Sequence, residues 1–545
     1  MIHGNIKKID LSTSIFERMI REGSLYVDKT HMIENFLNES SQVMLITRQR
    51  RLGKSLNMDT LRAFLSSQQD NRHLFKGLYI ESSPLWEKAH TAPVFNYNLR
   101  GLSTEMYEQE VWMQTIRNLY SLTDPEKLSG YAKMLSDSLL NKTIPSTGYL
   151  KTLTELAHVV TGKHAYLLID EYDSLLLSIY PGEKYEEIRR FLSDLIAQSM
   201  KDNPFLEKAL ITGVLRISYE SLFSGLNNIK IFDMFNDDVF TNDYGLTEDE
   251  ARELSKLADL DFDKITNWYN GIRVKGQAIY SMYSTMYYTR TGLFDCYWGR
   301  SGNLEMITDL INDNRVDILA KLLNNERVEK EVDNRVSLKQ LYAENNDSAF
   351  YSLLVQGGYL SHEKENPESA IAVLSIPNVE LRLVWQKFIL DMYYPSQGTL
   401  RTMFDRANDP VLFADDVEYF LENRLSYHDL AVYQGENPRR VHERLYHIFI
   451  MGILSAYDDT RYKRPSSNRE SGRGRYDILV EKGDANYIFE FKAAKSEDEL
   501  DAACKEALRQ IDEKRYGTDL NNKKQLRKVG VAVFGKLCRV MTEYL

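Results

Sequence analysis

A short apolar run, followed by a basic turn and a helix-like segment, constrains this chain more than any other feature. Residues 43–47 (Val-Met-Leu-Ile-Thr) have the length and composition of a buried strand. The turn contains Gly53, Lys54 and Ser55, and residues 56–65 show the spacing of a helix. Strand, loop and helix in this order form half of a βαβ unit. The sequence therefore predicts an α/β fold with a parallel sheet covered on both faces.

The Gly-Lys-Ser turn predicts a nucleotide-binding loop. Gly53 lets backbone N–H groups approach phosphate oxygens at the positive end of a helix. Lys54 is expected to reach the β- and γ-phosphates, and the Ser55 hydroxyl to bind Mg²⁺. Arg48 replaces the first glycine of the G-x-x-x-x-G-K-[ST] pattern, so a simple helix-capping turn is the alternative for these three residues alone. Positive charge at the loop is expected from three arginines, Arg48, Arg50 and Arg51.

Two further apolar runs place polar residues where a nucleoside triphosphatase needs them. Residues 165–169 end in Asp170, expected to hold Mg²⁺ through water, and Glu171, expected to orient the attacking water. Residues 208–214 bring Thr212 to the position of a γ-phosphate sensor. Arg216 follows and is expected to contact phosphate, in the same chain or across a subunit interface. Solvated strand-end acids and a structural ion pair of the arginine are the alternatives.

The rest of the chain divides by pattern. At ~100–200 residues per domain, 545 residues suggest about three domains. The parallel sheet, with a further strand at 93–97, is assigned to a domain over residues 1–245. A helical middle domain with a winged-helix-like unit is expected over 246–385, where a helix, a Gly357-Gly358 turn and a strand at 370–376 follow one another. The third domain, 386–545, is expected to contain helices at 440–455 and 497–514 and strands at 475–480, 487–492 and 528–534.

The third domain carries a D-x₁₂-E-x-K pattern on two expected strands. Glu490 and Lys492 are two residues apart, so their side chains leave the same face of a strand, where Asp477 can meet them across a hairpin. Asp477 and Glu490 form an oxygen-rich site for Mg²⁺, or Mn²⁺, and Lys492 is expected to orient a water. Glu443, from the preceding helix, and Gln510, from the following one, are expected to complete this α/β nuclease-like core. The alternative is a solvated charged hairpin.

Charge distribution limits the partners. The chain has 68 Lys and Arg against 79 Asp and Glu, but from Arg439 onward the balance is 22 against 17. Nucleic acid is therefore expected at the basic C-terminal end rather than on the acidic body. Three scattered cysteines exclude a disulfide framework, and no apolar stretch approaches the ~20 residues of a membrane span. A cytoplasmic protein without a membrane partner is expected.

Taken together, these motifs resemble a known family, the AAA-ATPase-like proteins with a C-terminal PD-(D/E)XK nuclease domain. That family also lacks the first glycine of the phosphate loop. One departure is Ile272, where the family usually has an aromatic residue after the glycine. The similar stretches are residues 26–30, 45–56, 168–173, 212–214, 223–228, 268–271, 375–380, 467–477 and 490–492.

The resemblance implies a function and leaves alternatives. We expect a protein that binds and hydrolyses ATP and thereby gates a Mg²⁺-dependent nuclease, with DNA a better candidate substrate than RNA. Residues 26–30, which precede the phosphate loop, are expected to shape the nucleotide pocket. A homo-oligomer is a possible assembly. The second hypothesis is a regulatory nucleotidase whose nuclease-like domain binds nucleic acid or a partner without cutting, and the third is a scaffold without turnover.

Overall fold

The structure is a computed structural model, and it forms two compact units. The first comprises Met1–Gly302 and Glu329–Glu380, and the second Asn303–Val328 and Leu381–Leu545. Each unit is described separately below. The structure describes residues 2–217, 222–223, 225–298, 305–308, 310–323, 326–336, 338–342, 346–364, 369–393, 408–424, 462–467, 470–471, 474–482, 485–516, 525–534 and 537–544.

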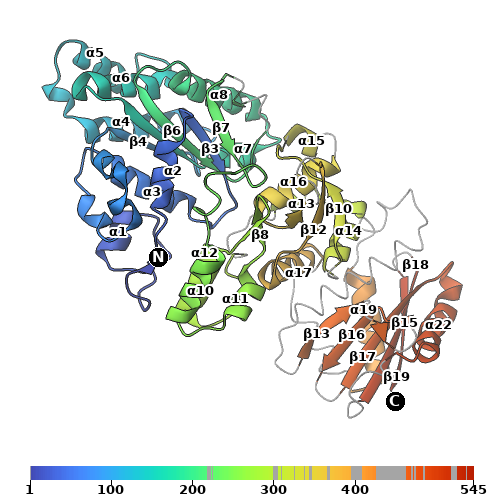
Figure 1. Cartoon of the computed structure of the whole chain (residues 1–545). Helices are drawn as coiled ribbons and strands as arrows, with labels where there is room; N and C mark the ends of the chain where they lie inside the picture. The colour runs from blue at the N-terminus through green and yellow to red at the C-terminus, as the bar shows by residue number, and fades with distance from the viewer. Residues whose placement is uncertain are drawn as a thin grey trace. The chain divides into compact units, whose positions relative to one another are not determined.

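A five-stranded parallel sheet forms the core of the first unit (Figure 1). Its strand order is β4-β5-β6-β3-β7, and every neighbouring pair is parallel. The expected strands at 43–47, 93–97, 165–169 and 208–214 are confirmed, whereas β7 was not predicted. The bounds are β3 (Val43–Thr47), β4 (Val94–Asn98), β5 (Ala165–Asp170), β6 (Leu206–Gly213) and β7 (Ile229–Phe232).

Helices cover both faces of this sheet (Figure 1). Successive side chains of a strand point to opposite faces, so Met44 and Ile46 share one face and Val43 and Leu45 the other. Met44 and Ile46 belong to one apolar cluster with residues of α1 (Phe16–Arg21), α2 (His31–Asn38) and α3 (Lys54–Leu65). Across the sheet, α4 (Tyr107–Leu122) contacts β4 and α6 (Tyr149–Thr161) contacts β5. Because both faces are buried, the strands read as continuous apolar runs.

The order of connections places the predicted nucleotide residues at one edge. From β3 the chain crosses to β4 at one side of the sheet, whereas from β6 it crosses to β7 on the other side of β3. In open α/β sheets, ligands bind outside the carboxyl ends of the strands where connections diverge in this way. The segments 48–55, 170–171 and 212–216 all follow such carboxyl ends.

The middle of the chain continues the first unit. The helix α10 (Glu248–Leu257) begins with a capping box between Thr247 and Glu250, as expected. The helix α16 (Asp347–Gly357) ends at Gly358, whose φ of 88° is left-handed, and a β-hairpin follows. The helix, the turn and the strand expected at 370–376 are therefore present, with Ser361–Glu363 as a further strand, and the winged-helix-like unit stays a prediction. Other elements here are α11 (Phe262–Tyr269), β8 (Ile272–Val274), β9 (Gln277–Ile279), α12 (Met282–Thr291), α15 (Leu338–Tyr342), β10 (Val328–Glu331), β11 (Ser361–Glu363) and β12 (Ile371–Ser375).

The second unit contains a mixed sheet of order β13-β16-β17-β18-β19. The β17–β18 pair is parallel and the other pairs are antiparallel. The helix α22 (Leu500–Glu513) covers β17 and β18. The expected strands and the second helix are confirmed, β19 was not predicted, and the helix expected at 440–455 lies outside the described residues. The strands are β13 (Tyr462–Ser467), β16 (Ile478–Lys482), β17 (Ala485–Ala493), β18 (Gln525–Phe534) and β19 (Leu537–Tyr544).

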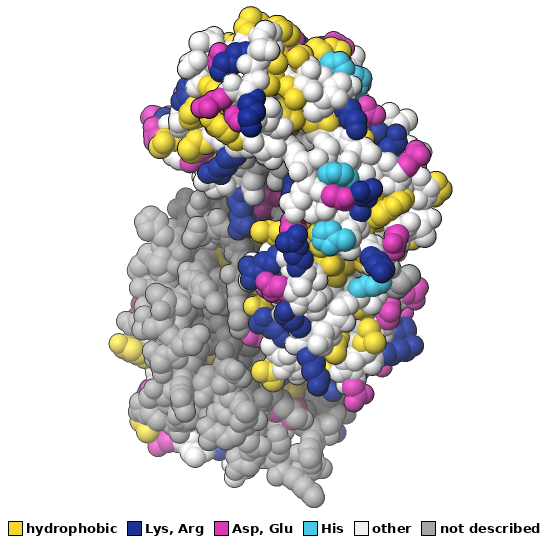
Figure 2. All heavy atoms as spheres, turned by 90° about the vertical axis from the view of Figure 1, so that its left-hand side faces the viewer, with side chains coloured by type: hydrophobic (Ala, Val, Ile, Leu, Met, Phe, Trp, Pro, Cys, Tyr) yellow, Lys and Arg dark blue, Asp and Glu magenta, His cyan; other side chains and the backbone are white. Residues whose placement is uncertain are grey.

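The surface of the first unit is mixed in charge. Figure 2 shows acidic and basic side chains interspersed on one face, with apolar side chains gathered near its top. Exposed apolar residues include Met113 and Tyr120 of α4 and Met134 of α5 (Gly130–Leu140). Across the described ranges, every helix is too short or too polar to cross a bilayer.

Candidate nucleotide and metal sites

The loop from β3 to α3 surrounds a buried lysine. Gly53, in a left-handed conformation with φ of 88°, directly precedes Lys54 at the start of α3. The Lys54 ammonium donates to the carbonyls of Arg48 and Gln49 at 2.9 and 2.8 Å. Burial lowers the pKa of Lys54 to about 8, although nearby carboxylates favour its charged form. These two bonds fix the position of the ammonium, which leaves a third proton to donate to a phosphate.

Three of the predicted residues meet at one carboxylate. The hydroxyl of Ser55 donates to Oδ2 of Asp170 at 2.6 Å, and the hydroxyl of Thr212 donates to Oδ1 of the same residue. These residues come from α3, β5 and β6, so the parallel sheet brings them together. A carboxylate beside a hydroxyl is the ligand set that a P-loop protein offers to Mg²⁺.

Glu171 lies directly beyond Asp170 with a strained backbone. Its φ is 53°, in the region that non-glycine residues rarely adopt. Burial raises the pKa of Glu171, whereas the charge of Arg100 opposes that rise. Nε of Arg100 lies 3.7 Å from a carboxylate oxygen of Glu171. Sequence reasoning did not select Arg100, although its place two residues after β4, at the same sheet edge, was a usable signal.

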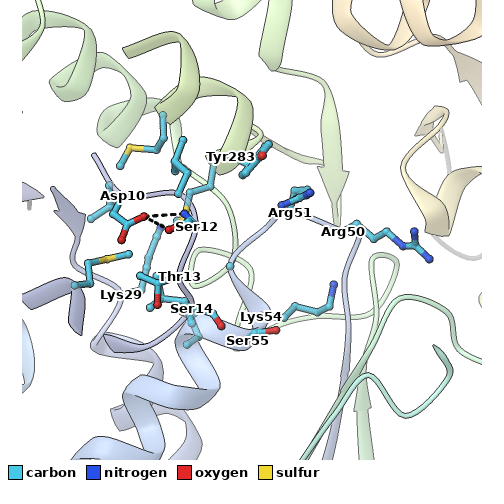
Figure 3. Close-up of a pocket in the computed structure, with 18 of the residues that line it drawn as sticks. Asp10, Ser12, Thr13, Ser14, Lys29, Arg50, Arg51, Lys54, Ser55 and Tyr283 are labelled. Atoms are coloured by element: carbon cyan, nitrogen blue, oxygen red, sulfur yellow. Dashed lines mark hydrogen bonds between the residues drawn. The ribbon is translucent and has the colours of Figure 1, made fainter. Parts of the chain in front are cut away.

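A cavity of about 370 Å³ opens beside the phosphate loop. Figure 3 shows Lys54 and Ser55 on one side of it and Asp10 and Ser12 on the other. The guanidinium of Arg51 lies 4.0 Å from the ring centroid of Tyr283 on α12. Segment 26–30, expected to shape the pocket, contributes Tyr26, Val27 and Lys29. Lining residues come mainly from segments 10–14, 25–29, 50–57 and 282–286.

Arg48 corrects one expectation, because it does not add positive charge to the nucleotide cavity. Its side chain is fully buried and forms an ion pair with Asp237 in the loop after β7. It also donates to the carbonyls of Thr47 and Phe232 at 2.8 and 3.2 Å. A buried guanidinium without such partners would be very costly, so its charge is used inside the fold. Arg48, which replaces the first loop glycine, therefore has a structural role in the fold.

Arg216 also forms an ion pair within the chain. Its Nη1 lies 2.9 Å from a carboxylate oxygen of Asp233, which is fully buried in the loop after β7. Its backbone N–H donates to Oε1 of Gln356 at 2.9 Å. The structure thus places the Arg216 guanidinium in the structural pair that was one of the two alternatives. It is not among the residues that line the cavity.

The second unit brings four of the five predicted nuclease residues together. The antiparallel register pairs Ile478 with Phe489, which sets Asp477 opposite Glu490. Oδ2 of Asp477 accepts the backbone N–H of Phe491 at 2.8 Å. The fifth residue, Glu443, lies outside the described residues.

The side chains of Glu490, Lys492 and Gln510 form one hydrogen-bonded cluster. Oε1 of Gln510 accepts from the Lys492 ammonium at 2.5 Å, and its amide donates to Oε1 of Glu490. The Lys492 ammonium lies 3.6 Å from the same carboxylate oxygen. The Gln510 amide also lies 3.4 Å from the hydroxyl of Tyr516. Strand β17 and helix α22 therefore supply the two sides of this cluster.

The electrostatics of Glu490 suit a divalent cation. Burial, with a contribution from the charge of Asp477, raises the pKa of Glu490 to about 8. Its Oε2 is buried and accepts no hydrogen bond from the residues that the structure describes. Two carboxylates that destabilise each other in a buried place are stabilised by a metal ion between them. Among the described residues no group of three or more Asp, Glu, His or Cys side chains is placed to hold a metal ion. Asp477 and Glu490 are the two predicted ligands that the strand register brings together.

Comparisons with known proteins find one family match in each of the two regions that contain these residues. Residues 10–223 match the family described as predicted AAA-ATPase, and residues 441–543 match the PD-(D/E)XK nuclease superfamily. An Azotobacter chroococcum mcd 1 relative, described as an uncharacterized protein in the vnfD 5′ region, is 27% identical over 524 residues. The match spans 94% of this chain and 93% of that protein.

Among solved structures, the Aeropyrum pernix ORC2 protein in its ADPNP-ADP complexes matches with a TM-score of 0.25. The identity is 10% over 70% of this chain and 95% of that one. By the two family models, residues 10–223 are similar to predicted AAA-ATPases and residues 441–543 to the PD-(D/E)XK nuclease superfamily.

Proposed function

We propose that this protein hydrolyses ATP in its first unit and that its nucleotide state controls a divalent-metal-dependent DNA nuclease in its second. In this proposal residues 1–245 form the ATPase, residues 246–385 relay its state, and residues 386–545 cut DNA. The observation that carries the ATPase assignment is the Asp170 carboxylate held by Ser55 and Thr212 beside Lys54. The nuclease assignment rests on the cluster of Glu490, Lys492 and Gln510.

In the first unit, the residues have separable roles. Lys54 neutralises charge on the β- and γ-phosphates while its other two protons stay on the loop carbonyls. Mg²⁺ held at Ser55 and Asp170 would neutralise further charge on the phosphate oxygens. Glu171 accepts a hydrogen bond from the attacking water and orients it, since its carboxylate faces the cavity. The adenine ring of ATP is expected to lie between residues 10–14 and α12, where the cavity continues.

In the second unit, Asp477 and Glu490 would hold the divalent cation, with Mg²⁺ and Mn²⁺ both suited to oxygen ligands. A cation there would polarise the scissile phosphodiester and acidify a water. Lys492 neutralises charge that develops on the phosphate. Gln510 holds both Glu490 and Lys492, so it keeps them at a fixed separation. DNA is preferred to RNA only by analogy with the nuclease family.

The test is cleavage of linear, supercoiled and single-stranded DNA with Mg²⁺ or Mn²⁺, each with and without ATP. We expect the wild type to cut and its rate to change with ATP. Glu490→Ala and Lys492→Ala should abolish cleavage and leave ATP hydrolysis intact. Matched controls are Glu497→Ala and Lys505→Ala, which remove exposed side chains from the same unit. Equal cleavage by wild type and Lys492→Ala would reject the nuclease assignment.

Two other outcomes would point elsewhere. ATP hydrolysis without cleavage in any lane would favour the regulatory nucleotidase, whose nuclease-like unit binds without cutting. Gel filtration of the same preparation, with and without ATP, tests the possible homo-oligomer. Absence of ATP hydrolysis in the wild type and in Lys54→Ala alike would reject the ATPase assignment.

A further inference from the structure

The C-terminal turn of α16 packs against the phosphate loop. Gln49, which follows Arg48 in that loop, is 2% exposed, and its amide lies directly over Gly358. A Cβ atom at Gly358 would stand 2.3 Å from Oε1 of Gln49, well inside van der Waals contact. The Gln49 amide nitrogen also lies 3.5 Å from the carbonyl of Val355. The contact joins residues 306 positions apart in the chain.

Gln49 also contacts Lys54, the residue that is proposed to bind phosphate. Its backbone carbonyl accepts from the Lys54 ammonium at 2.8 Å, while its side chain is enclosed by Gly358, Val355 and Met234. The side chain of Gln49 therefore contacts α16, while its backbone carbonyl binds the Lys54 ammonium. A shift of the Gln49 side chain moves its peptide, and therefore moves the carbonyl that orients Lys54.

A second contact from the same turn reaches the loop after β6. Gln356, 1% exposed, accepts the backbone N–H of Arg216 at 2.9 Å through Oε1. Its amide nitrogen lies 3.4 Å from the carbonyl of Asp333. Val336 then donates its N–H to the carbonyl of Arg216 at 2.9 Å. The segment that contains α16 therefore contacts two loops. One follows β3 and leads to Lys54, and the other follows β6, the strand that contains Thr212.

We propose that the α16 turn, residues 355–358, is a positioning element of the nucleotide site. It fixes the phosphate-loop peptide through Gln49, so that Lys54 is aimed at the phosphates. Because linkage is reciprocal, a nucleotide that tightens the loop also stabilises the turn. The proposal rests on the proposed nucleotide binding and adds a contact that transmits nucleotide occupancy to the winged-helix-like segment.

A glycine substitution with a matched control tests this directly. Gly358→Ala introduces the clash with Gln49, and its positive φ of 88° adds strain. Gly276→Ala adds a similar strain at φ of 80°, but a Cβ there meets no atom within 4 Å. We expect Gly358→Ala to raise the Kd for a non-hydrolysable ATP analogue about ten-fold and Gly276→Ala to change it less than about two-fold. The full chain is used throughout.

A second substitution separates positioning from general damage. Gln49→Ala in the Gly358→Ala background removes the clashing amide together with the contact that fixes the loop, so the double variant should bind the analogue about as well as Gln49→Ala alone, and both should bind it less tightly than the wild type. Amide hydrogen exchange over residues 346–364 gives the reciprocal readout. The nucleotide should slow exchange there in the wild type and in Gly276→Ala, and should not slow it in Gln49→Ala.

The outcomes distinguish the two levels of the proposal. If the wild type binds nucleotide, and Gly358→Ala binds it as well as Gly276→Ala does, the α16 turn has no positioning role. A Gln49→Ala variant that binds nucleotide as tightly as the wild type, or equal nucleotide protection of residues 346–364 in Gln49→Ala, overturns the proposal in the same way. A wild type that binds no nucleotide, like Lys54→Ala, overturns the proposed ATPase function itself and the positioning role with it.

Discussion

Two buried carboxylates, one in each unit, are treated differently by their surroundings. Asp170 has a hydroxyl donor on each of its oxygens, from Ser55 and Thr212. Glu490 has the Gln510 amide on one oxygen, while the other is buried and accepts no hydrogen bond within the described part of the chain. Asp170 is the last residue of β5, whereas Glu490 lies within β17.

The difference indicates what each site still needs. A carboxylate with donors on both oxygens is stable in the fold without any ion, so the nucleotide site is organised in advance. A carboxylate with an unsatisfied buried oxygen beside a second acid is destabilised until a cation or a proton arrives. The first site is therefore expected to respond to nucleotide, and the second to a divalent metal alone.

The largest expected effect comes from Glu171, which shares the strand end with Asp170. Glu171→Gln keeps the size of the side chain but removes the negative oxygen that orients water. We expect ATP hydrolysis to fall about 100-fold while ATP affinity stays within about two-fold. Turnover and equilibrium binding, measured on the same preparation, check this. The control Glu183→Gln removes an exposed acid of the same unit, and a similar loss in that variant would remove the special role of Glu171.

The second prediction concerns metal in the absence of nucleotide. Mn²⁺ should raise the thermal unfolding midpoint of the wild type by several degrees, since an ion that binds only the folded state stabilises it. Glu490→Gln should abolish that rise, because the ligand set is lost. Asp170→Asn should keep it, because the first unit binds its ion together with nucleotide. Loss of the Mn²⁺ response in Asp170→Asn instead would reverse the contrast between the two carboxylates.

The sequence predicted the strands inside each five-stranded sheet and the edge strand β4, and missed the edge strands β7, β13 and β19. Residues 43–47 and 165–169 are continuous apolar runs, which only a covered strand needs. By contrast, β7 (Ile229–Phe232) and β19 (Leu537–Tyr544) lie at sheet edges and mix polar with apolar residues without a clear period. Short segments of mixed polarity also occur in loops and helices, so periodicity does not identify these two strands.

The same limit applies to the candidate sites. Lys54, Ser55 and Asp170 stand in local motifs whose spacing is visible in the chain. The partners of Arg48 and Gln49 are not, because Asp237 lies 189 residues away and Val355 lies 306 residues away. Only the fold reveals that Arg48 forms a buried ion pair with Asp237 and is not a phosphate ligand.

A third buried carboxylate, Glu380, extends the comparison of buried acids to the pH dependence of stability. Its Oε1 accepts from the backbone N–H of Trp298 at 2.7 Å and from the Ser284 hydroxyl at 2.9 Å, while Oε2 is buried and has no hydrogen-bond partner among the described residues. Burial raises the pKa of Glu380 from its ordinary value near 4.5 to about 7. The folded state therefore holds this proton more tightly than the unfolded state does.

The sign of the pH effect follows from that difference. The stabilisation that comes from the protonated Glu380 is fully present below the pKa of this carboxyl in the unfolded chain. It is lost as the pH rises to and through about 7, the pKa in the folded protein. Glu380→Gln should remove this loss, on the order of 3 kcal/mol, and flatten the dependence between about pH 4.5 and 7. Denaturant unfolding at several pH values measures it. An unchanged slope would show that Glu380 stays ionised in the fold.

The smallest effect is expected at Arg100. Its Nε lies 3.7 Å from Glu171, but the side chain is 72% exposed, so solvent and salt screen the pair. Arg100→Ala should change the ATP turnover less than about three-fold, and the difference should shrink further as salt is added. Steady-state turnover at low and high salt, compared with Arg117→Ala on α4, measures this. A ten-fold loss that persists at high salt would mean that Arg100 contacts the nucleotide itself. In that case the charge balance of the ATPase site would extend to β4, and Glu171 would not be independent of its neighbour.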